Sequence, residues 1–353
     1  MSKHRVAVAA FAFLSIASYA YSATASGYVE TTLVTNAIDP DLVNPWGISL
    51  SGGSPFWVSD NGTGKSTLYN SAGVKQGLVV SMPTGSEPVT GQVFNGTAGN
   101  FHGDAFIFAT ENGTIAGWRG ALGTTAEQLF AVNGAGYKGL AISTAKDTLY
   151  GANFKAGTID VFNSAGLMAS FADPSVPAGY APFNIQNING KLYVTYALRG
   201  ATGDDIAGAG HGFVSVFDPV AHTFSRLVSQ GVLDSPWGLA FAPTTFNALS
   251  GDLLVGNFGD GTINAFDPLS GTYVATLGNL NGTPLVNDGL WGLTVGNGGN
   301  GGSVSSLYIA AGPNGETGGL FARIDAVPEP SAVLLGAAGM ALLIWRRRAT
   351  AHR

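Results

Sequence analysis

The sequence predicts an all-β fold built from a repeated unit, and three observations support this prediction. First, 52 glycines and 16 prolines in 353 residues, with only 11% charged residues, leave few segments able to form an amphipathic helix. Second, a Trp-Gly pair followed by alternating apolar residues occurs at 46–47, 237–238 and 291–292. Third, the unit recurs every roughly 45 to 55 residues. Repeats of this length made of short strands are typical of a β-propeller, whose four-stranded blades pack against one another.

Six blades are expected. Their first strands begin near residues 46, 91, 139, 183, 237 and 291, and their second strands are predicted at 56–59, 105–108, 149–152, 192–195, 253–256 and 307–310. Third strands follow Gly-rich turns, as at 113–118, 157–162 and 261–266, and most fourth strands are short, as at 78–80 and 273–276. We expect the Gly after each Trp to let adjacent backbones approach near the axis, and the Trp to fill the space between blades.

The last blade has one strand too few. It supplies only three strands before the C-terminal tail, the third of them at 320–324. We expect residues 28–34 to provide the missing outer strand, so that the N-terminal strand closes the last blade. Closure of this kind removes an exposed sheet edge that would otherwise invite aggregation.

The N-terminus has the parts of a secretory signal peptide. Lys3, His4 and Arg5 form a basic segment, residues 6–20 are apolar, and Ala23-Thr24-Ala25 is a small-x-small cleavage site. The predicted division is therefore a signal peptide at 1–25, a propeller at 26–326 and a tail at 327–353. The chain has no cysteine, so burial rather than disulfide bonds must stabilise it.

The tail combines Pro328-Glu329-Pro330, an apolar run at 332–345 and the basic cluster Arg346, Arg347 and Arg348. A helix over that run would rise roughly 21 Å, which is short of the ~30 Å hydrocarbon core of a bilayer. The arginines would stay on the cytoplasmic side, with everything upstream exported. An ordinary C-terminal anchor is the alternative interpretation.

This order of features resembles the PEP-CTERM signal of Gram-negative bacteria that make extracellular polysaccharide. The resemblance covers residues 327–348 and implies that a membrane protease of the exosortase type recognises Pro328, Glu329 and Pro330 and removes the tail. It also implies transient anchoring through a short transmembrane helix and a final location in the cell envelope or outside the cell.

The repeats resemble six-bladed propellers of the NHL-repeat and gluconolactonase type over residues 30–325. They also resemble an exported bacterial propeller family with Asn-Pro-Trp-Gly-Ile (44–48) and Trp-Val-Ser-Asp-Asn-Gly-Thr-Gly (57–64), which implies no particular activity. Lactonases of the first type hold calcium over the channel through Glu, Asn and Asp from different blades. The Asp expected a few residues after the turn is absent here, where 46–49 reads Trp-Gly-Ile-Ser and 291–294 reads Trp-Gly-Leu-Thr.

One set of residues could still hold a cation. Asp60, Asn153 and Asn257 follow the second strand in three blades, so one channel mouth is predicted to carry oxygen ligands suited to calcium. Asx turns at strand ends explain the same residues without a ligand.

Two further groups of titratable residues could carry chemistry. The long loop at 199–212 contains Asp204, Asp205 and His211, and it is either a functional loop on a rigid scaffold or a flexible solvated one. His102 and Asp104 form either an acid/base pair or a chance neighbourhood.

The charge pattern bears on function. A formal net charge of −6, with no basic stripe outside the two ends, argues against a nucleic-acid partner. The sequence therefore predicts an exported binding or interaction protein whose partners are exopolysaccharide or envelope proteins. A metal-dependent lactonase or lyase, with calcium at the channel mouth, is the alternative, and a structural protein that holds partners on its blade faces is a third.

Overall fold

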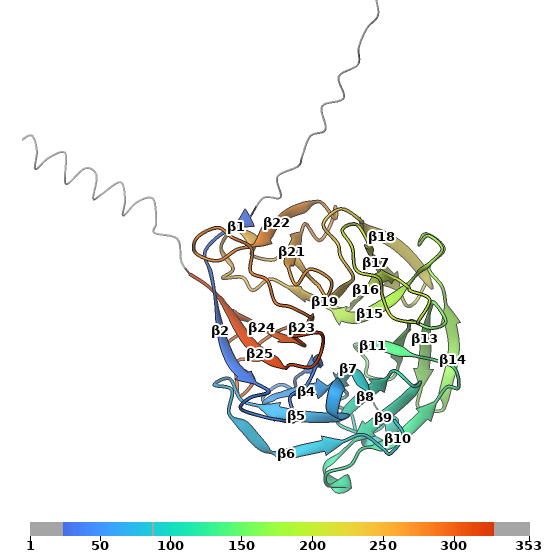
Figure 1. Ribbon diagram of the computed structural model, residues 1–353. Coiled ribbons are helices and arrows are strands. Elements are labelled where there is room, and N and C mark those ends of the chain that lie inside the picture. The colour runs from blue at the N-terminus through green and yellow to red at the C-terminus, as the bar shows by residue number, and fades with distance from the viewer. Residues whose placement is uncertain (1–23, 87, 328–353) are drawn as a thin grey trace, which may run out of the picture.

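The computed structural model describes residues 24–86 and 88–327, which form six β-sheets around a central axis (Figure 1). Successive strands of each sheet are antiparallel neighbours, and the first strands of adjacent blades contact one another around the axis. The described residues contain no α-helix, only four short 3-10 turns. The predicted all-β, six-bladed propeller is confirmed.

The blades follow one another along the chain. Blade 1 contains β3 (Pro45–Ser49), β4 (Phe56–Asp60), β5 (Lys65–Tyr69) and β6 (Lys75–Ser81); blade 2 contains β7 (Val89–Phe94), β8 (Phe106–Thr110), β9 (Thr114–Trp118) and β10 (Glu127–Ala131). Blade 3 contains β11 (Tyr137–Ile142), β12 (Leu149–Asn153), β13 (Thr158–Asn163) and β14 (Gly166–Phe171); blade 4 contains β15 (Tyr180–Ile188), β16 (Lys191–Leu198), β17 (Gly212–Asp218) and β18 (Thr223–Ser229). Blade 5 contains β19 (Pro236–Phe241), β20 (Leu253–Asn257), β21 (Ile263–Phe266) and β22 (Tyr273–Leu277); blade 6 contains β23 (Leu290–Val295), β24 (Ser306–Ala311), β25 (Leu320–Ala326) and β2 (Tyr28–Thr35). The 3-10 turns are η1 (Asn61–Thr63), η2 (Phe101–Gly103), η3 (Gly120–Leu122) and η4 (Asn247–Leu249).

The N-terminal strand β2 closes the last blade, as predicted. It pairs antiparallel with β25, with Tyr28 opposite Ala326 and Thr35 opposite Leu320. Its side chains Tyr28 and Val34 are both only 1% exposed. The ring therefore joins the two ends of the described chain in one sheet.

A two-residue strand, β1 (Thr24–Ala25), precedes β2 and adds a fifth, parallel strand beside β22. The signal-peptide cleavage predicted after Ala25 would remove β1 and uncover the edge of β22 at Thr276 and Leu277. That boundary stays a prediction, because residues 1–23 lie outside the described part of the chain.

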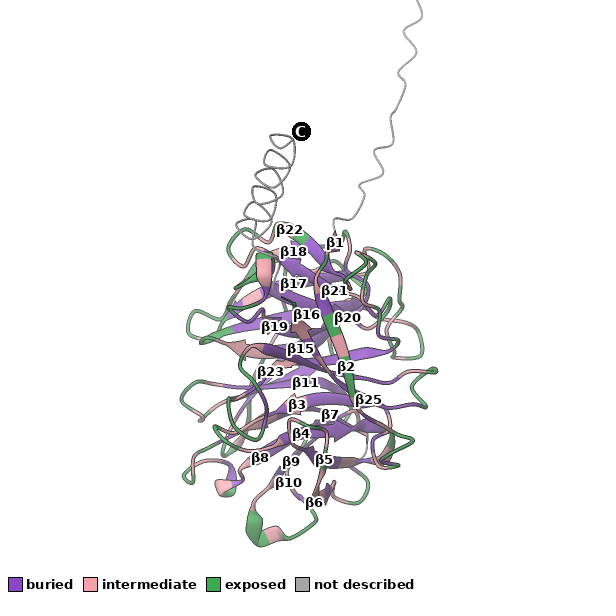
Figure 2. Cartoon of the chain, turned by 90° about the vertical axis from the view of Figure 1, so that its left-hand side faces the viewer, coloured by how far each residue is buried: buried purple, intermediate pink, exposed green. Residues whose placement is uncertain are grey.

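Apolar side chains fill the spaces between neighbouring blades. Trp57 of β4 stacks on Phe106 of β8, with ring centroids 3.8 Å apart, and so joins blades 1 and 2. Tyr150 of β12 and Phe217 of β17 meet edge-on, with ring centroids 6.3 Å apart, and join blades 3 and 4. In the edge-on view of Figure 2 the strands are mostly buried, whereas the loops on both sides are exposed. Each sheet is thus stabilised by burial against its neighbours, as the absence of cysteine requires.

Near the axis, at Gly91 and Gly292, neighbouring blades approach so closely that only glycine fits. A Cβ atom on Gly91 of β7 would lie 2.3 Å from the backbone nitrogen of Leu140 in β11, and one on Gly292 of β23 would lie 2.4 Å from the carbonyl oxygen of Trp46. Real Cβ atoms do not approach backbone atoms this closely, so a larger residue would push the blades apart. The expected role of the Gly in the repeat is confirmed.

Because the strands alternate in direction, the loops fall on two opposite faces. We call the face with the loops after each second strand the mouth face; these loops are 61–64, 111–113, 154–157, 199–211, 258–262 and 312–319. The opposite face carries the hairpins after the first and third strands. We call the face that carries these hairpins the tail face. The chain leaves the fold at Val327, at the rim between the two faces: its carbonyl accepts a 3.0 Å hydrogen bond from Asn247 in one of the hairpins, and Gly27, which accepts from its N–H (2.7 Å), donates to Asn279 in a connection on the mouth side.

No helix within residues 24–86 and 88–327 has the length and hydrophobicity to cross a bilayer. The predicted sorting residues Pro328, Glu329 and Pro330 and the cluster 346–348 lie outside the described residues.

Removing β2 is expected to destabilise the fold strongly. A chain that starts at residue 36 loses the burial of Tyr28 and Val34, worth about 3–6 kcal/mol together, and exposes the edge of β25. A chain that starts at residue 27 loses only β1 and is the matched control. Thermal unfolding followed by circular dichroism should show a large fall in Tm, or aggregation, for the first chain only. Equal Tm values would contradict the closure.

Candidate functional sites at the two ends of the axis

Three tryptophans meet on the axis below the mouth face. Trp46 stacks on Trp291 with ring centroids 3.6 Å apart, and Trp237 stands edge-on to these two rings at 6.1 and 5.9 Å. Phe154, Phe183 and Phe258 add three more rings to the cluster. Blades 1, 5 and 6 thus contribute one Trp each, and the three rings meet at the axis, whereas the sequence predicts them in the spaces between adjacent blades. The Gly after each Trp lies against the backbone of the next blade, which leaves no room for a ring between the two sheets. Each Trp side chain therefore turns toward the axis.

Lys138 of β11 stands where other blades have Trp. Its Nζ lies 5.1 Å from the centroid of the Trp46 ring, close enough for a cation–π contact. The same ammonium pairs with the carboxylate of Glu111, in the β8–β9 loop, and lies 3.8 Å from Asp204. Only 11% of the Lys138 side chain is exposed. A cation is therefore fixed at the centre of the mouth, between the aromatic cluster and acidic loops.

A chain of hydrogen bonds extends from this pair around the mouth. Asn61 donates to Glu111 (3.2 Å), and Asn44 donates to Asn61 (3.3 Å) and to Glu316 (2.6 Å). Burial raises the pKa of the Glu316 carboxyl, while the bond from Asn44 opposes that shift. Beside Lys138 lies a small pocket of about 190 Å³, lined also by Glu111, Phe154, Lys155, Thr202 and Asp204. Sequence reasoning missed Lys138, Glu111 and Glu316, although a Lys in the Trp position was a visible signal.

The long loop at 199–211 contributes to the mouth. Asp204 faces Lys138, and burial raises the pKa of the neighbouring Asp205. His211, the third titratable residue of this loop named in the sequence analysis, does not join the two carboxylates. Its Nδ1 lies 2.9 Å from the carbonyl oxygen of Ile206 in the same loop. The loop thus brings carboxylates, and not its histidine, to the centre of the mouth.

Two of the three predicted calcium ligands make hydrogen bonds at the ends of their strands. The Asn153 oxygen accepts from the backbone N–H groups of Gly136 and Ala156, both at 3.2 Å. Asn257 donates to the carbonyl of Val232 (2.8 Å) and to Asp260 (3.1 Å), while its own oxygen is buried without a partner. Calcium binding by these residues stays a prediction.

Asp60, the third predicted ligand, is completely buried at the end of β4. The Thr67 hydroxyl lies near, but neither carboxylate oxygen has a hydrogen bond of normal geometry. Burial raises the pKa of Asp60 well above its ordinary value of 3.8, and Asp39 and Asp41 raise it further, against the opposing effect of Thr67. A neutral, protonated carboxyl satisfies this environment better than a charged one.

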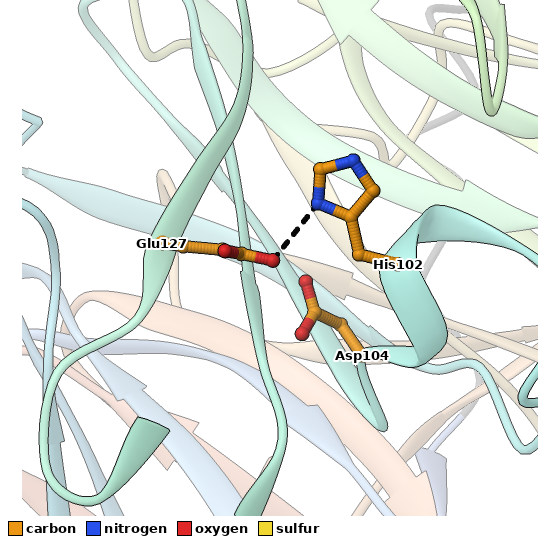
Figure 3. Close-up of side chains that lie close together, drawn as sticks. All are labelled: His102, Asp104 and Glu127. Carbon is orange, nitrogen blue, oxygen red and sulfur yellow. Dashed lines mark hydrogen bonds and ion pairs between the residues drawn. The ribbon is translucent and has the colours of Figure 1, made fainter. Parts of the chain in front are cut away.

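His102 and Asp104 lie on the tail face of blade 2, where Glu127 joins them (Figure 3). One ligand atom from each of the three lies within 4.8 Å of the others, a spacing that could hold a metal ion. Arg119 already occupies this space, however, with its guanidinium 2.7 Å from Asp104 and paired with Glu127. The group is therefore an ion-paired cluster that joins β10 to the loop before β8.

The other end of the axis opens into a vestibule of about 480 Å³ on the tail face. All six blades line it, mainly through the second halves of their first strands. Its polar lining consists of Ser49, Gln92, Thr144, Lys146, Asn184, Gln186, Asn187, Asn189 and Thr294. The apolar lining includes Ile48, Leu140 and Leu293. Among the described residues of this wall, Lys146 is the only titratable one.

Comparisons with known proteins add three findings. Residues 326–348 match the model of the PEP-CTERM protein-sorting motif. Two proteins of Acanthamoeba polyphaga mimivirus, R648 and L690, are 36% and 34% identical to this chain over 281 and 280 residues. Each alignment covers 72% of this chain, with 69% of R648 and 74% of L690. The chain belongs to the family of these two proteins.

Two solved structures have a fold similar to that of this chain. A streptogramin B lyase matches with a TM-score of 0.55 over 85% of this chain and 98% of its own. The virginiamycin B lyase of Staphylococcus aureus matches with a TM-score of 0.52, over 85% and 99%. Both are 11% identical to this chain, so the likeness concerns the propeller fold alone. The finer resemblance to NHL-repeat and gluconolactonase propellers stays a prediction.

Asp60→Asn is expected to stabilise the protein at neutral pH. Because the folded state raises the pKa of Asp60, the unfolded chain releases this proton first, and stability falls as the pH rises above the ordinary value of 3.8. The neutral amide of Asn removes this penalty, so the free energy of unfolding at neutral pH should rise by about 1–3 kcal/mol, and the gain should shrink in acid. Urea unfolding curves at acidic and neutral pH measure this free energy.

Asp218→Asn is the matched control, because backbone hydrogen bonds lower the pKa of this exposed carboxyl and its neutralisation should not stabilise. The same unfolding curves, repeated with calcium, also test the predicted cation site. If calcium stabilised the parent protein and not Asp60→Asn, the carboxyl would be a ligand and the neutral-acid interpretation would be wrong.

Proposed function

We propose that this protein is an exported binding protein whose vestibule holds a neutral, hydroxyl-rich ligand of the extracellular matrix, such as a segment of polysaccharide. The PEP-CTERM motif indicates export and sorting by an exosortase-type system to the envelope or the extracellular space. The ligand and the binding role are our inference, supported by the shape and chemistry of the vestibule.

The observation that carries the proposal is a cavity of about 480 Å³ with an almost uncharged wall. This volume is within the range of small-ligand sites, roughly 300–1,000 Å³. Its amides and hydroxyls can exchange hydrogen bonds with sugar hydroxyls, while Ile48 and Leu293 offer contact to C–H faces. The Ser49 hydroxyl is buried without a partner, so a ligand could satisfy it. Burial lowers the pKa of Lys146, which makes a fixed positive charge less favourable there.

Filling the vestibule is expected to abolish binding. Thr294→Trp places a large ring in the wall, and Thr202→Trp, which places the same ring in the mouth pocket, is the matched control. Isothermal titration with neutral glucan oligosaccharides and with purified exopolysaccharide should show at least a ~10-fold loss of affinity, about 1.4 kcal/mol, for Thr294→Trp only. Equal binding by both variants and the parent would place the ligand elsewhere.

A second function is supported by the mouth. The Lys138–Glu111 pair beside a small pocket has the composition of an acid/base site, and it is the basis for an alternative role as a lactonase or lyase. Calcium would be the cofactor of that alternative, with Glu111, Asp204 and Glu316 offering carboxylate oxygens of the kind that it prefers.

Lys138→Met separates the two functions. If the mouth is catalytic, this change should lower turnover of lactone or elimination substrates at least about 100-fold, since it removes the proton-transferring group. Thr294→Trp should leave that turnover unchanged. The reaction is run once with calcium and once with a chelator, and product formation is measured by chromatography. Turnover that survives in Lys138→Met would exclude this residue from catalysis.

A further inference from the structure

We propose that His102, Asp104 and Glu127 on the tail face of blade 2 form a binding site for a zinc ion, and that Arg119 takes the place of the metal when none is bound. Three protein ligands leave the fourth position of a tetrahedral zinc ion to water. The site lies outside the vestibule wall and the mouth pocket, so this inference does not depend on the proposed function.

The first argument is the convergence of three ligand atoms. One such atom from each residue lies within 4.8 Å of the others, and Figure 3 shows the three side chains pointing toward one another. Zinc ligands stand about 2.0–2.2 Å from the ion, so small rotations of these side chains bring their atoms to a common point. An imidazole nitrogen with two carboxylates suits zinc, whereas calcium takes oxygen ligands alone.

The second argument is a buried carboxylate oxygen that lacks a partner. Asp104 is completely buried, and its Oδ2 makes no hydrogen bond within the described part of the chain. This oxygen lies over Gly117, where a Cβ atom would be 1.9 Å from it. Gly117 is the β9 partner of Glu127, so Oδ2 lies on the side of the other carboxylate. Burial of an unpaired charged oxygen is unfavourable, and coordination to a metal ion removes that cost.

The third argument is charge. Arg119 places a single nitrogen, Nη1, between the two carboxylates, 2.7 Å from Oδ1 of Asp104 and in contact with Oε1 of Glu127. One positive charge therefore faces two negative charges while His102 is neutral. Burial raises the pKa of the Asp104 carboxyl, Arg119 lowers it, and Glu127 raises it again. A divalent ion at this point neutralises both carboxylates, which the single guanidinium does not.

The backbone holds His102 in this position. Phe101, His102 and Gly103 have φ values of 49°, 57° and 74°, so three successive residues are left-handed. Such a turn is costly for residues other than glycine. It is anchored by the backbone N–H of Phe101, which donates to the Ser164 hydroxyl of blade 3 at 3.0 Å. The imidazole is therefore fixed beside Glu127 before any metal arrives.

A metal ion can reach this site, and Arg119 can leave it. The His102 side chain is 58% exposed and that of Glu127 is 29% exposed, so the cluster is open to solvent on one side. Arg119 directly follows β9, and 33% of its side chain is exposed. Its long side chain can therefore move its charge into water when a divalent ion takes its place.

The test compares three variants with the parent, all made without a histidine tag. His102→Asn removes the imidazole but keeps a residue type that tolerates a left-handed backbone. His222→Asn is the matched control, because His222 is also exposed on a tail-face hairpin and has a φ of 54°. Arg119→Gln removes the competing guanidinium. Zinc affinity is measured by isothermal titration with zinc chloride, and stability by thermal unfolding with zinc and with a chelator.

The parent and His222→Asn are expected to bind one zinc ion per chain with equal affinity. His102→Asn should bind it at least ~10-fold more weakly, since the loss of even an outer partner of a metal ligand costs about 10–100-fold. Arg119→Gln should bind zinc severalfold more tightly than the parent, because no guanidinium has to be displaced. In chelator this variant should unfold at a lower temperature than the parent, and zinc should restore its stability.

The opposite signs of these two effects distinguish a metal site from a simple ion-paired cluster. His102→Asn changes an exposed side chain, so it should unfold like the parent in chelator, and its weaker zinc binding then reports ligation. Absence of zinc binding by the parent, an equal loss in His222→Asn, or zinc binding by Arg119→Gln that is no tighter than that of the parent would overturn the proposal.

Discussion

The close approach of the innermost strands around the axis is the constraint on which the rest of this structure depends. At Gly91 and Gly292 the next blade's backbone lies where a Cβ atom would be, so neighbouring blades touch with no side chain between them. The residue before each Gly can then turn only toward the axis. Three tryptophans do so and fill it. A short repeat motif thereby determines both the packing of the blades and the division of the channel into two separate ends.

Two of the departures from this motif are informative. Blade 4 has Asn184 where other blades have Gly, and its amide donates a 2.8 Å hydrogen bond to the carbonyl of Trp237, which maintains the contact with blade 5. Blade 3 has Lys138 where three others have Trp, and this change brings a positive charge to an otherwise apolar position. The first departure preserves the packing, whereas the second creates the charged mouth. Local breaks in a regular pattern often mark functional sites.

Much of the fold could be predicted because the repeat is visible along the chain. The blade number, the approximate start of each first strand and the closing role of residues 28–34 all follow from the Trp-Gly spacing and from the strand missing in the last blade. The candidate sites were harder to predict from the sequence, because they join residues from different blades. Asn44 and Glu316, which share a hydrogen bond, are 272 positions apart. Alternation along a strand indicates a face but not the partner on the next blade. For this reason the sequence placed Asn153 at a strand end but not beside Gly136, whose N–H donates to its side-chain oxygen across 17 positions of the chain.

The two ends of the axis have opposite chemistry, although the same six first strands build both. At the starts of these strands the mouth gathers the Lys138 ammonium with the carboxylates of Glu111 and Asp204, because the β8–β9 loop and the long loop 199–211 bring these acids to it. The second halves of the strands line the vestibule, where Lys146 is the only titratable residue among those described. The Trp rings fill the axis between the two ends. Chemistry that needs a fixed charge or a cation therefore belongs to the mouth, whereas a neutral, hydroxyl-rich ligand fits only the wall of the vestibule.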